Sequence, residues 1–230
     1  MTSTTKDIKL TPIKSNAWTC PLFQNWFSGF VKSGCLIKHL FLKSKIIKDD
    51  GEIYSLLLEI KYVTPEGFKQ TRSILLRGCA CVVVPIVRIE NQSSFLLVQQ
   101  RRVINGNFSL EYPAGKIETD KTPIEAAQEE LHQECGIHLP TEKFLPLSEP
   151  LNVCESAFDE TAIWFYCYLD NFNAEAMLAN NSYGENSNGE YTHLKLVSEK
   201  SMHKINNFQI KTGLQLLREK GLINSQVAQD

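Results

Sequence analysis

The sequence has 230 residues, enough for one sizeable domain with an extension and for a substantial hydrophobic core. Its 24 basic and 26 acidic residues nearly balance, giving a formal net charge of −2, and no run of Lys or Arg marks a nucleic-acid track or a membrane-binding surface. Neither nucleic acid nor a membrane is therefore an expected partner.

The first 20 residues show no hydrophobic periodicity and are predicted to form a flexible leader. They lack the apolar core of a signal peptide, and no apolar run in the chain approaches the roughly 18 residues needed to cross a bilayer. The seven cysteines are odd in number and include no C-x-x-C pair, which is typical of reduced thiols in an intracellular protein. We therefore expect a cytoplasmic protein.

An aromatic helix is predicted from Pro21 onward. The run PLFQNWFSGFV places Phe23, Trp26, Phe27 and Phe30 at helical spacing on one face. Such a stripe usually packs against a core. Trp26 could instead stack on a nucleotide base, because purine rings often lie on aromatic side chains.

Three strands are predicted to follow the aromatic helix, at residues 36–48, 53–63 and 68–76. The turn sequences Asp49-Asp50-Gly51 and Pro65-Glu66-Gly67 separate them. Short turns between consecutive strands indicate an antiparallel meander.

A central strand is predicted between Gly78 and Val87, where the sequence is apolar throughout, as in a strand covered on both faces. A further strand is predicted at residues 95–100. Arg102 comes directly after it, where its planar guanidinium could bind phosphate or ribose, or could instead pair with Glu111.

The best-marked element is an acidic helix that begins after Thr122. The Thr122 hydroxyl can cap the helix, Pro123 suits the first helical position, and Glu125 completes a capping box. Gly136 is the expected left-handed stop. The apolar stripe between these ends comprises Ile124, Ala127, Leu131 and Cys135.

The acidic side chains of this helix fall in two rows. Glu130 and Glu134 lie along one edge of the apolar stripe, while Glu129 and Gln133 point away from it. Glutamates four residues apart on a helix can simply be exposed to solvent without a function. The preceding Ala114 could, however, present its carbonyl to the same edge, and an all-oxygen ligand set suits a hard cation. We predict that Glu130, Glu134 and Ala114 bind Mg²⁺, or Mn²⁺ in its place.

The C-terminal part begins with the acidic loop NVCESAFDE, which leads into a further apolar strand. A loop rich in Asn, Ser and Gly and a terminal amphipathic helix are also evident in the pattern. The predicted elements are a strand at 161–169, a short helix at 173–178, a flexible loop at 180–189, a last strand at 190–197 and a helix at 208–220.

The acidic helix and the loop before it resemble a known signature. Nudix hydrolases carry the pattern Gly-x5-Glu-x7-Arg-Glu-U-x-Glu-Glu-x-Gly-U, with U apolar, and the segment from Glu111 to Gly115 is similar to the ELPAG segment of the ADP-ribose and ADP-sugar pyrophosphatase branch. The resemblance implies an α/β (α+β) fold, a Nudix-type α/β/α sandwich with a mixed sheet, preceded by an N-terminal antiparallel β extension. The matching positions are Gly115, Glu130, Leu131, Glu134, Gly136 and Ile137.

Three positions depart from the Nudix pattern. Lys121 stands where the first Glu is expected and Glu129 where Arg is expected, so the signs of a pair that holds the loop to the helix are exchanged. Attraction would survive this exchange, although independent drift on a solvated face remains the alternative. Gln133 stands in place of a Glu and lacks its charge. This would weaken the binding of any metal that used this side chain and could reduce or abolish activity.

The resemblance also assigns domains and a dimer. Residues 21–77 would form an N-terminal helix and sheet that build a homodimer, and residues 78–225 would form the Nudix hydrolase domain. Arg72 would then reach the nucleotide, unless it is simply an exposed strand arginine. Arg102 and Glu111 are further predicted substrate-binding residues.

The acidic loop supplies the last predicted site residue. Related enzymes carry Asp-Glu just before the strand that follows this loop, and Asp159-Glu160 falls there. Glu160 is therefore predicted to act with Glu130 and Glu134 in catalysis, as a metal ligand or as the general base that deprotonates water. Glu155 is the fallback.

The implied activity is Mg²⁺-dependent hydrolysis of the pyrophosphate bond in a nucleoside diphosphate sugar, ADP-ribose or an ADP-sugar, giving AMP and a sugar phosphate. The alternative is a catalytically weak or inactive Nudix-like module that binds ADP-ribose or a nucleotide sugar. A Nudix class acting on capped RNA or coenzyme A is disfavoured by the missing basic track and by the EYPAG context.

Overall fold

The computed structural model describes residues 9–10, 16–89, 92–104, 106–170, 183 and 192–224. The chain divides into two compact units, an N-terminal unit of Met1–Cys79 with Asn152–Thr161 and a second unit of Ala80–Leu151 with Ala162–Asp230. The predicted helix at 173–178 and the predicted loop at 180–189 lie outside the described residues, apart from Tyr183.

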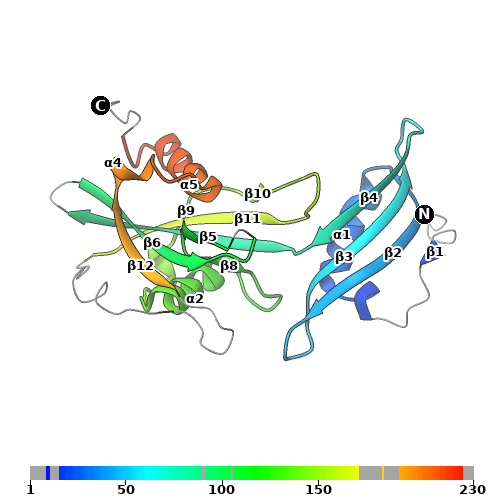
Figure 1. Cartoon of the computed structure of the whole chain (residues 1–230), viewed down its shortest axis with the longest axis horizontal. Helices are drawn as coiled ribbons and strands as arrows, with labels where there is room; N and C mark the ends of the chain where they lie inside the picture. Colours follow the sequence, from blue (N-terminus) through cyan, green and yellow to red (C-terminus); the bar gives the residue numbers. More distant parts are fainter. Residues whose placement is uncertain are drawn as a thin grey trace. The chain divides into compact units, whose positions relative to one another are not determined.

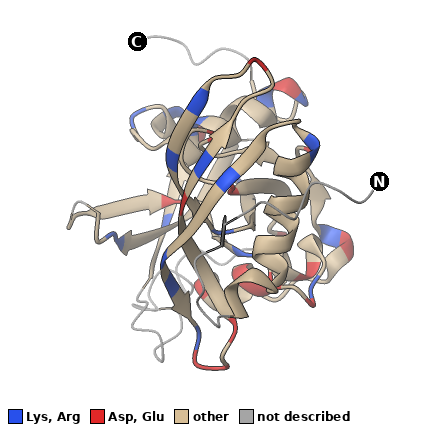
Figure 2. Ribbon diagram, turned by 90° about the vertical axis from the view of Figure 1, so that its right-hand side faces the viewer, with Lys and Arg blue, Asp and Glu red and all other residues tan. Residues whose placement is uncertain are grey.

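The N-terminal unit is built on a four-stranded sheet in the order β1-β2-β3-β4 (Figure 1). Strands β2, β3 and β4 pair antiparallel, as predicted for the meander, whereas β1, within the predicted leader, pairs parallel with β2. Lys and Arg recur along the strands of this sheet (Figure 2). The elements are β1 (Lys9–Leu10), a 3-10 turn η1 (Asn16–Trp18), α1 (Pro21–Lys32), β2 (Leu36–Ile47), β3 (Ile53–Val63) and β4 (Lys69–Leu76).

Helix α1 and the sheet share one hydrophobic core. Phe23 of α1 is buried, and the rings of Trp26 and Phe30 are packed against the same core, with their centroids 5.4 Å apart. Leu56 and Leu58 of β3 are fully buried. The aromatic stripe of α1 therefore packs this unit together.

The second unit holds a larger sheet in the order β10-β11-β5-β6-β12, with β7, β8 and β9 paired to its members. Strand β5 pairs antiparallel with β6 and β8, whereas the backbone bonds Leu169 N to Ile86 O (2.9 Å) and Thr161 N to Gly78 O (3.4 Å) run in parallel register, so the sheet is mixed. The strands are β5 (Cys79–Ile89), β6 (Gln92–Arg101), β7 (Phe108–Glu111), β8 (Ala114–Lys116), β9 (Leu145–Pro146), β10 (Leu151–Asn152), β11 (Thr161–Tyr168) and β12 (His193–Ser198).

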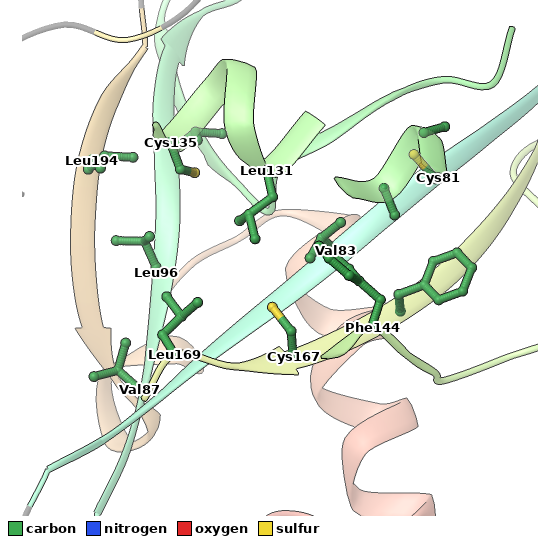
Figure 3. Packing of buried hydrophobic residues seen from close by; sticks show 14 residues of the cluster. Cys81, Val83, Val87, Leu96, Leu131, Cys135, Phe144, Cys167, Leu169 and Leu194 are labelled. Carbon is green, nitrogen blue, oxygen red and sulfur yellow. The ribbon is translucent and has the colours of Figure 1, made fainter. Parts of the chain in front are cut away.

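Alternate residues of β5 face opposite sides of the sheet. Cys81 and Val83 pack in one core with Leu131 of α2 (Pro123–Cys135), as Figure 3 shows. Val82 and Val84 pack in a second core with α5 (Phe208–Glu219). Short helical pieces complete the unit, η2 (Thr141–Lys143) and α4 (Glu199–Met202). The predicted α/β/α sandwich with a mixed sheet and an antiparallel N-terminal extension is confirmed.

All seven cysteines are free thiols, and Cys81, Cys135 and Cys167 are buried. Burial raises the pKa of the Cys167 thiol to about 12, so that this group stays protonated at neutral pH. Within the described part of the chain, no helix combines the length and the apolar character that crossing a bilayer requires.

Candidate active site

Helix α2 begins and ends where its sequence predicts. The Thr122 hydroxyl accepts a hydrogen bond from the Glu125 N–H (3.4 Å), and the Glu125 carboxylate accepts one from the Thr122 N–H (2.8 Å), which completes the capping box. Gly136 ends the helix with a φ of 68°, the left-handed conformation that glycine adopts without strain. These signals fix which side chains α2 presents to the sheet and to the loop before it.

Glu134 is buried and is tied to the backbone of strand β8, which precedes α2. Its Oε2 accepts a hydrogen bond from the Ala114 N–H at 3.1 Å, and its own carbonyl accepts one from the Thr192 hydroxyl at 3.0 Å. The Ala114 contact is made by the amide of the residue whose carbonyl was predicted as a ligand. The loop and the helix edge therefore meet where the sequence places them.

Glu130 lies against Gly115, the next residue of β8. A Cβ added to Gly115 would be 1.7 Å from Glu130 Oε1 and 2.1 Å from its Cδ. Any side chain at position 115 would thus occupy the space of the carboxylate. The glycine therefore lets the Glu130 carboxylate lie beside the backbone of β8 without being displaced.

The outer row of α2 is held by an ion pair. Lys121 Nζ contacts the carboxylate of Glu129 and also lies 3.1 Å from Glu118 Oε2. The hydrogen bond that Lys121 donates to Glu129 raises the pKa of Lys121 above its ordinary value, with Glu118 acting in the same direction. Gln133 Nε2 donates to Glu129 Oε1 at 3.3 Å. The predicted attraction between Lys121 and Glu129 is confirmed.

Arg102 and Glu111 form a two-point ion pair. The guanidinium Nε and Nη2 lie 3.0 and 2.5 Å from the two oxygens of Glu111, which is the contact foreseen as the alternative to substrate binding by Arg102. Burial acts to raise the pKa of Glu111, but hydrogen bonding and charge from Arg102, with a hydrogen bond from Ser109, outweigh it and hold the pKa below its usual value. The pair joins the end of β6 to β7.

Glu160 belongs to the N-terminal unit, together with the rest of the loop 152–161. Its carboxylate lies 3.2 Å from Nη1 of Arg77, and its side chain is 16% exposed. The fallback residue Glu155 is exposed and accepts a hydrogen bond from Asn152 at 2.7 Å. Of the two loop glutamates, Glu160 is thus the more enclosed.

Arg72 and Trp26 also lie in the N-terminal unit. Arg72 is exposed on β4, where its Nη1 donates to the Thr71 carbonyl at 2.9 Å. Trp26 packs on the rings of Phe23 and Phe30. Their predicted roles in substrate binding remain predictions.

Two residues at the loop 152–161 were not foreseen from the sequence. Arg77 pairs with Glu160, and Asp159 accepts hydrogen bonds from backbone amides at the end of β4. No local pattern signals either contact, because the partners are more than 80 positions apart for each pair. The only available signal was the position of Asp159 next to a predicted catalytic residue.

Glu130 and Glu134 of α2 are the candidate ligands for a cation. In the residues that the structure describes, no group of three or more His, Cys, Asp or Glu is arranged to hold a metal ion. Mg²⁺ in enzymes is, however, commonly bound by one or two carboxylates together with water and substrate phosphates. Glu130 and Glu134, set against the loop by Gly115 and Ala114, meet that requirement.

A solved structure and a human protein are similar to this chain. The structure is similar to a solved structure described as ADP compounds hydrolase, with a TM-score of 0.55 and 14% identity over 82% of this chain and 97% of that chain. In Homo sapiens, the protein described as 8-oxo-dGDP phosphatase NUDT18 is 36% identical over 77 residues, which are 33% of this chain and 23% of that protein. The matched segment thus spans less than a quarter of the human protein.

The family follows from a longer match. The family model of the NUDIX domain matches residues 80–211, more than half of the sequence. The chain therefore belongs to the NUDIX domain family. The match contains α2 and the segment before it, and it ends within the first turn of α5.

Proposed function

We propose that the protein is a Mg²⁺-dependent hydrolase of the pyrophosphate bond in a nucleoside diphosphate sugar, ADP-ribose or an ADP-sugar, releasing AMP and a sugar phosphate. The observation that carries the proposal is the position of two α2 carboxylates beside the backbone of β8, Glu130 against Gly115 and Glu134 on the Ala114 amide.

The charges of this site explain the need for a cation. Two unit negative charges about 5 Å apart repel by roughly 3 kcal/mol at an effective dielectric constant of about 20. A diphosphate beside Glu130 and Glu134 would therefore be repelled. Bound Mg²⁺, held by Glu130, Glu134 and the Ala114 carbonyl, would offset that repulsion, stabilise charge on the leaving phosphate and lower the pKa of water.

The chain's own groups would divide the remaining work. Glu160 would take the proton of the attacking water as general base, or serve as a further metal ligand. Arg102, fixed in direction by Glu111, would contact phosphate or ribose, since its side chain is 44% exposed despite the ion pair. Arg72 and Trp26 would contact the nucleotide.

Two observations support an adenosine diphosphate compound as substrate. The segment from Glu111 to Gly115 is similar to the ADP-sugar branch of the family, and the similar solved structure is described as an ADP compounds hydrolase. By the same resemblance we propose a cytoplasmic homodimer built through the N-terminal sheet. Sedimentation velocity of the purified protein tests the dimer, and a monomer at micromolar concentration would refute it.

Two other functions have specific support. The human relative is described as an 8-oxo-dGDP phosphatase, which favours an oxidised nucleoside diphosphate as substrate. Gln133 in place of a family Glu favours a weak or inactive module that binds ADP-ribose or a nucleotide sugar. These alternatives differ from the main proposal in substrate and in turnover, and both can be measured.

The deciding experiment incubates the purified full-length protein with ADP-ribose, ADP-glucose or 8-oxo-dGDP, with Mg²⁺ or with EDTA, and follows the products by chromatography. We expect Mg²⁺-dependent AMP release from an ADP compound and a loss of at least about 10²-fold in kcat for Glu134→Gln. Glu129→Gln, on the outer row of the same helix, is the matched control and should retain activity.

Each alternative has its own signature in the same experiment. Turnover of 8-oxo-dGDP without turnover of ADP compounds would identify the oxidised nucleotide as the substrate. Binding of ADP-ribose in calorimetry with no product would assign the non-catalytic module.

A further inference from the structure

The loop 152–161 has a closed shape of its own. The Val153 N–H donates to the Glu160 carbonyl at 3.0 Å, across the two ends of the loop. Inside it, the Ala157 and Phe158 N–H groups both donate to the Cys154 carbonyl, at 3.2 and 3.0 Å. These bonds set the path of the backbone up to Glu160.

The same loop is attached to the end of β4. The Leu75 N–H donates to the Ala157 carbonyl at 2.9 Å, and the Asp159 N–H donates to the Leu75 carbonyl at 3.4 Å. Leu75 and Phe158 accordingly form a parallel bridge. The loop therefore extends the N-terminal sheet by a short parallel segment.

Asp159 adds a stronger attachment through its side chain. Its Oδ1 accepts hydrogen bonds from the Arg77 N–H at 2.6 Å and from the Gly78 N–H at 3.1 Å. Hydrogen bonds to an ionised acceptor are stronger than those between neutral groups. Gly78 has a φ of 81°, so the backbone turns at the point that Asp159 holds.

Arg77 reaches back to the neighbouring carboxylate. Its guanidinium Nη1 lies 3.2 Å from Glu160 Oε2. Asp159 thus fixes the backbone of Arg77, and the side chain of Arg77 in turn contacts Glu160. Arg77, Asp159 and Glu160 form one connected unit, which we call the Arg77 clamp.

We propose that the Arg77 clamp positions Glu160 for proton transfer, with Asp159 and Arg77 as positioning residues that do not touch the substrate. The inference rests on the proposed function, in which Glu160 acts on the attacking water. A general base must lie within hydrogen-bond reach of the proton it takes, and an error of about 1 Å can cost about 10²-fold in rate. A loop residue meets this requirement only when the loop is held in place.

The test compares four variants of the full-length protein with ADP-ribose and Mg²⁺. Asp159→Ala removes the acceptor oxygen, whereas Asp159→Asn keeps one. Arg77→Gln removes the guanidinium, whereas Arg77→Lys keeps a cation. Lys69→Gln is the control, because Lys69 is an exposed cation on β4, the strand that ends just before Arg77.

We expect Asp159→Ala and Arg77→Gln to lower kcat by about tenfold or more while KM changes by less than about threefold. Asp159→Asn and Arg77→Lys should recover most of that loss, and Lys69→Gln should match the parent protein. Hydrogen exchange gives a readout besides activity, since the amides of Arg77 and Gly78 should exchange faster in Asp159→Ala than in Asp159→Asn.

Several outcomes would overturn the clamp. Equal kcat in the parent and all five variants, or a rise in KM with kcat unchanged, would show that Glu160 does not depend on the Arg77 clamp. A drop in thermal stability without a selective loss of kcat would make the contacts purely structural. Absence of turnover in the parent protein would refute the proposed function and the clamp together, whereas turnover with an unaffected Asp159→Ala would refute the clamp alone.

Discussion

Carboxylates in the second unit are held in two different ways. Glu130 and Glu134 lie against the backbone of β8, whereas Glu111 and Glu129 lie against an arginine and a lysine. A backbone amide orients a carboxylate but carries no net charge, while a guanidinium or ammonium group neutralises it. The ion pairs of Glu111 and Glu129 fasten one part of the scaffold to another, whereas the Ala114 amide orients the Glu134 carboxylate beside the backbone of β8.

The three departures from the family pattern all lie on the ion-paired side of α2. The sign exchange at Lys121 and Glu129 falls on the cation-paired side, where attraction is what matters and either sign order supplies it. Gln133 also falls there, donating to Glu129. The loop-facing pair, Glu130 and Glu134, keeps the family residues.

The largest expected effect comes from the contact between Gly115 and Glu130. In Gly115→Ala the new Cβ would need the space of the Glu130 carboxylate, which can swing away because it ends a flexible side chain. We therefore expect kcat/KM for an ADP compound to fall by about 10²-fold, while the unfolding free energy changes by less than about 1 kcal/mol.

Gly29→Ala is the matched control for this substitution. Gly29 lies in α1, and a Cβ there meets no atom within 4 Å. The activity of Gly29→Ala should equal that of the parent protein. Full activity of Gly115→Ala would mean that the position of the Glu130 carboxylate does not matter for turnover.

The elements set by local signals could be predicted from the sequence. The limits of α2, its capping box and the direction of its two acidic rows follow from residues within one or two turns of each other. The meander was predicted to within about two residues at each strand end, because turn residues mark its boundaries. Even the contact of Lys121 with Glu129 could be inferred, since the family pattern supplied the pairing.

Contacts between distant segments could not be predicted in the same way. Whether Arg102 meets a ligand or Glu111 depends on how β6 and β7 pair, and the sequence left both readings open. The attachment of the loop 152–161 to β4 depends on a sheet edge that no local pattern describes. The path of Glu160 is fixed by that edge, and its partner Arg77 went unforeseen.

A smaller effect is expected on stability when the carboxylate of an ion pair is removed. Glu111→Gln leaves Arg102 without its charged partner and should lower the unfolding free energy by about 1–3 kcal/mol at pH 7. The pKa of Glu111 is lowered in the folded protein, so its stabilisation is present above the ordinary value of 4.5 and is lost as the pH falls through the folded value.

Denaturant unfolding of the parent protein and Glu111→Gln between pH 7 and pH 3 measures this dependence. The difference in unfolding free energy between the parent protein and Glu111→Gln should decrease as the pH falls. Glu142→Gln, at an exposed glutamate of η2, should show no such gap. A gap that stays constant with pH would show that the ion pair does not stabilise the fold through its charge.

The smallest expected effect concerns Lys121 and Glu129, whose side chains are 28% and 40% exposed. Lys121→Glu and Glu129→Arg should each destabilise the protein, and the double variant should recover part of the loss, with a coupling energy of about 0.5–1 kcal/mol. Recovery is incomplete because Glu118 also contacts Lys121 and would repel a glutamate. Coupling should shrink in 1 M salt, where charges on the surface are screened. If the destabilisations of the two single variants simply add in the double variant at low salt, Lys121 and Glu129 are not a compensating pair. The order of their charges then contributes nothing to stability.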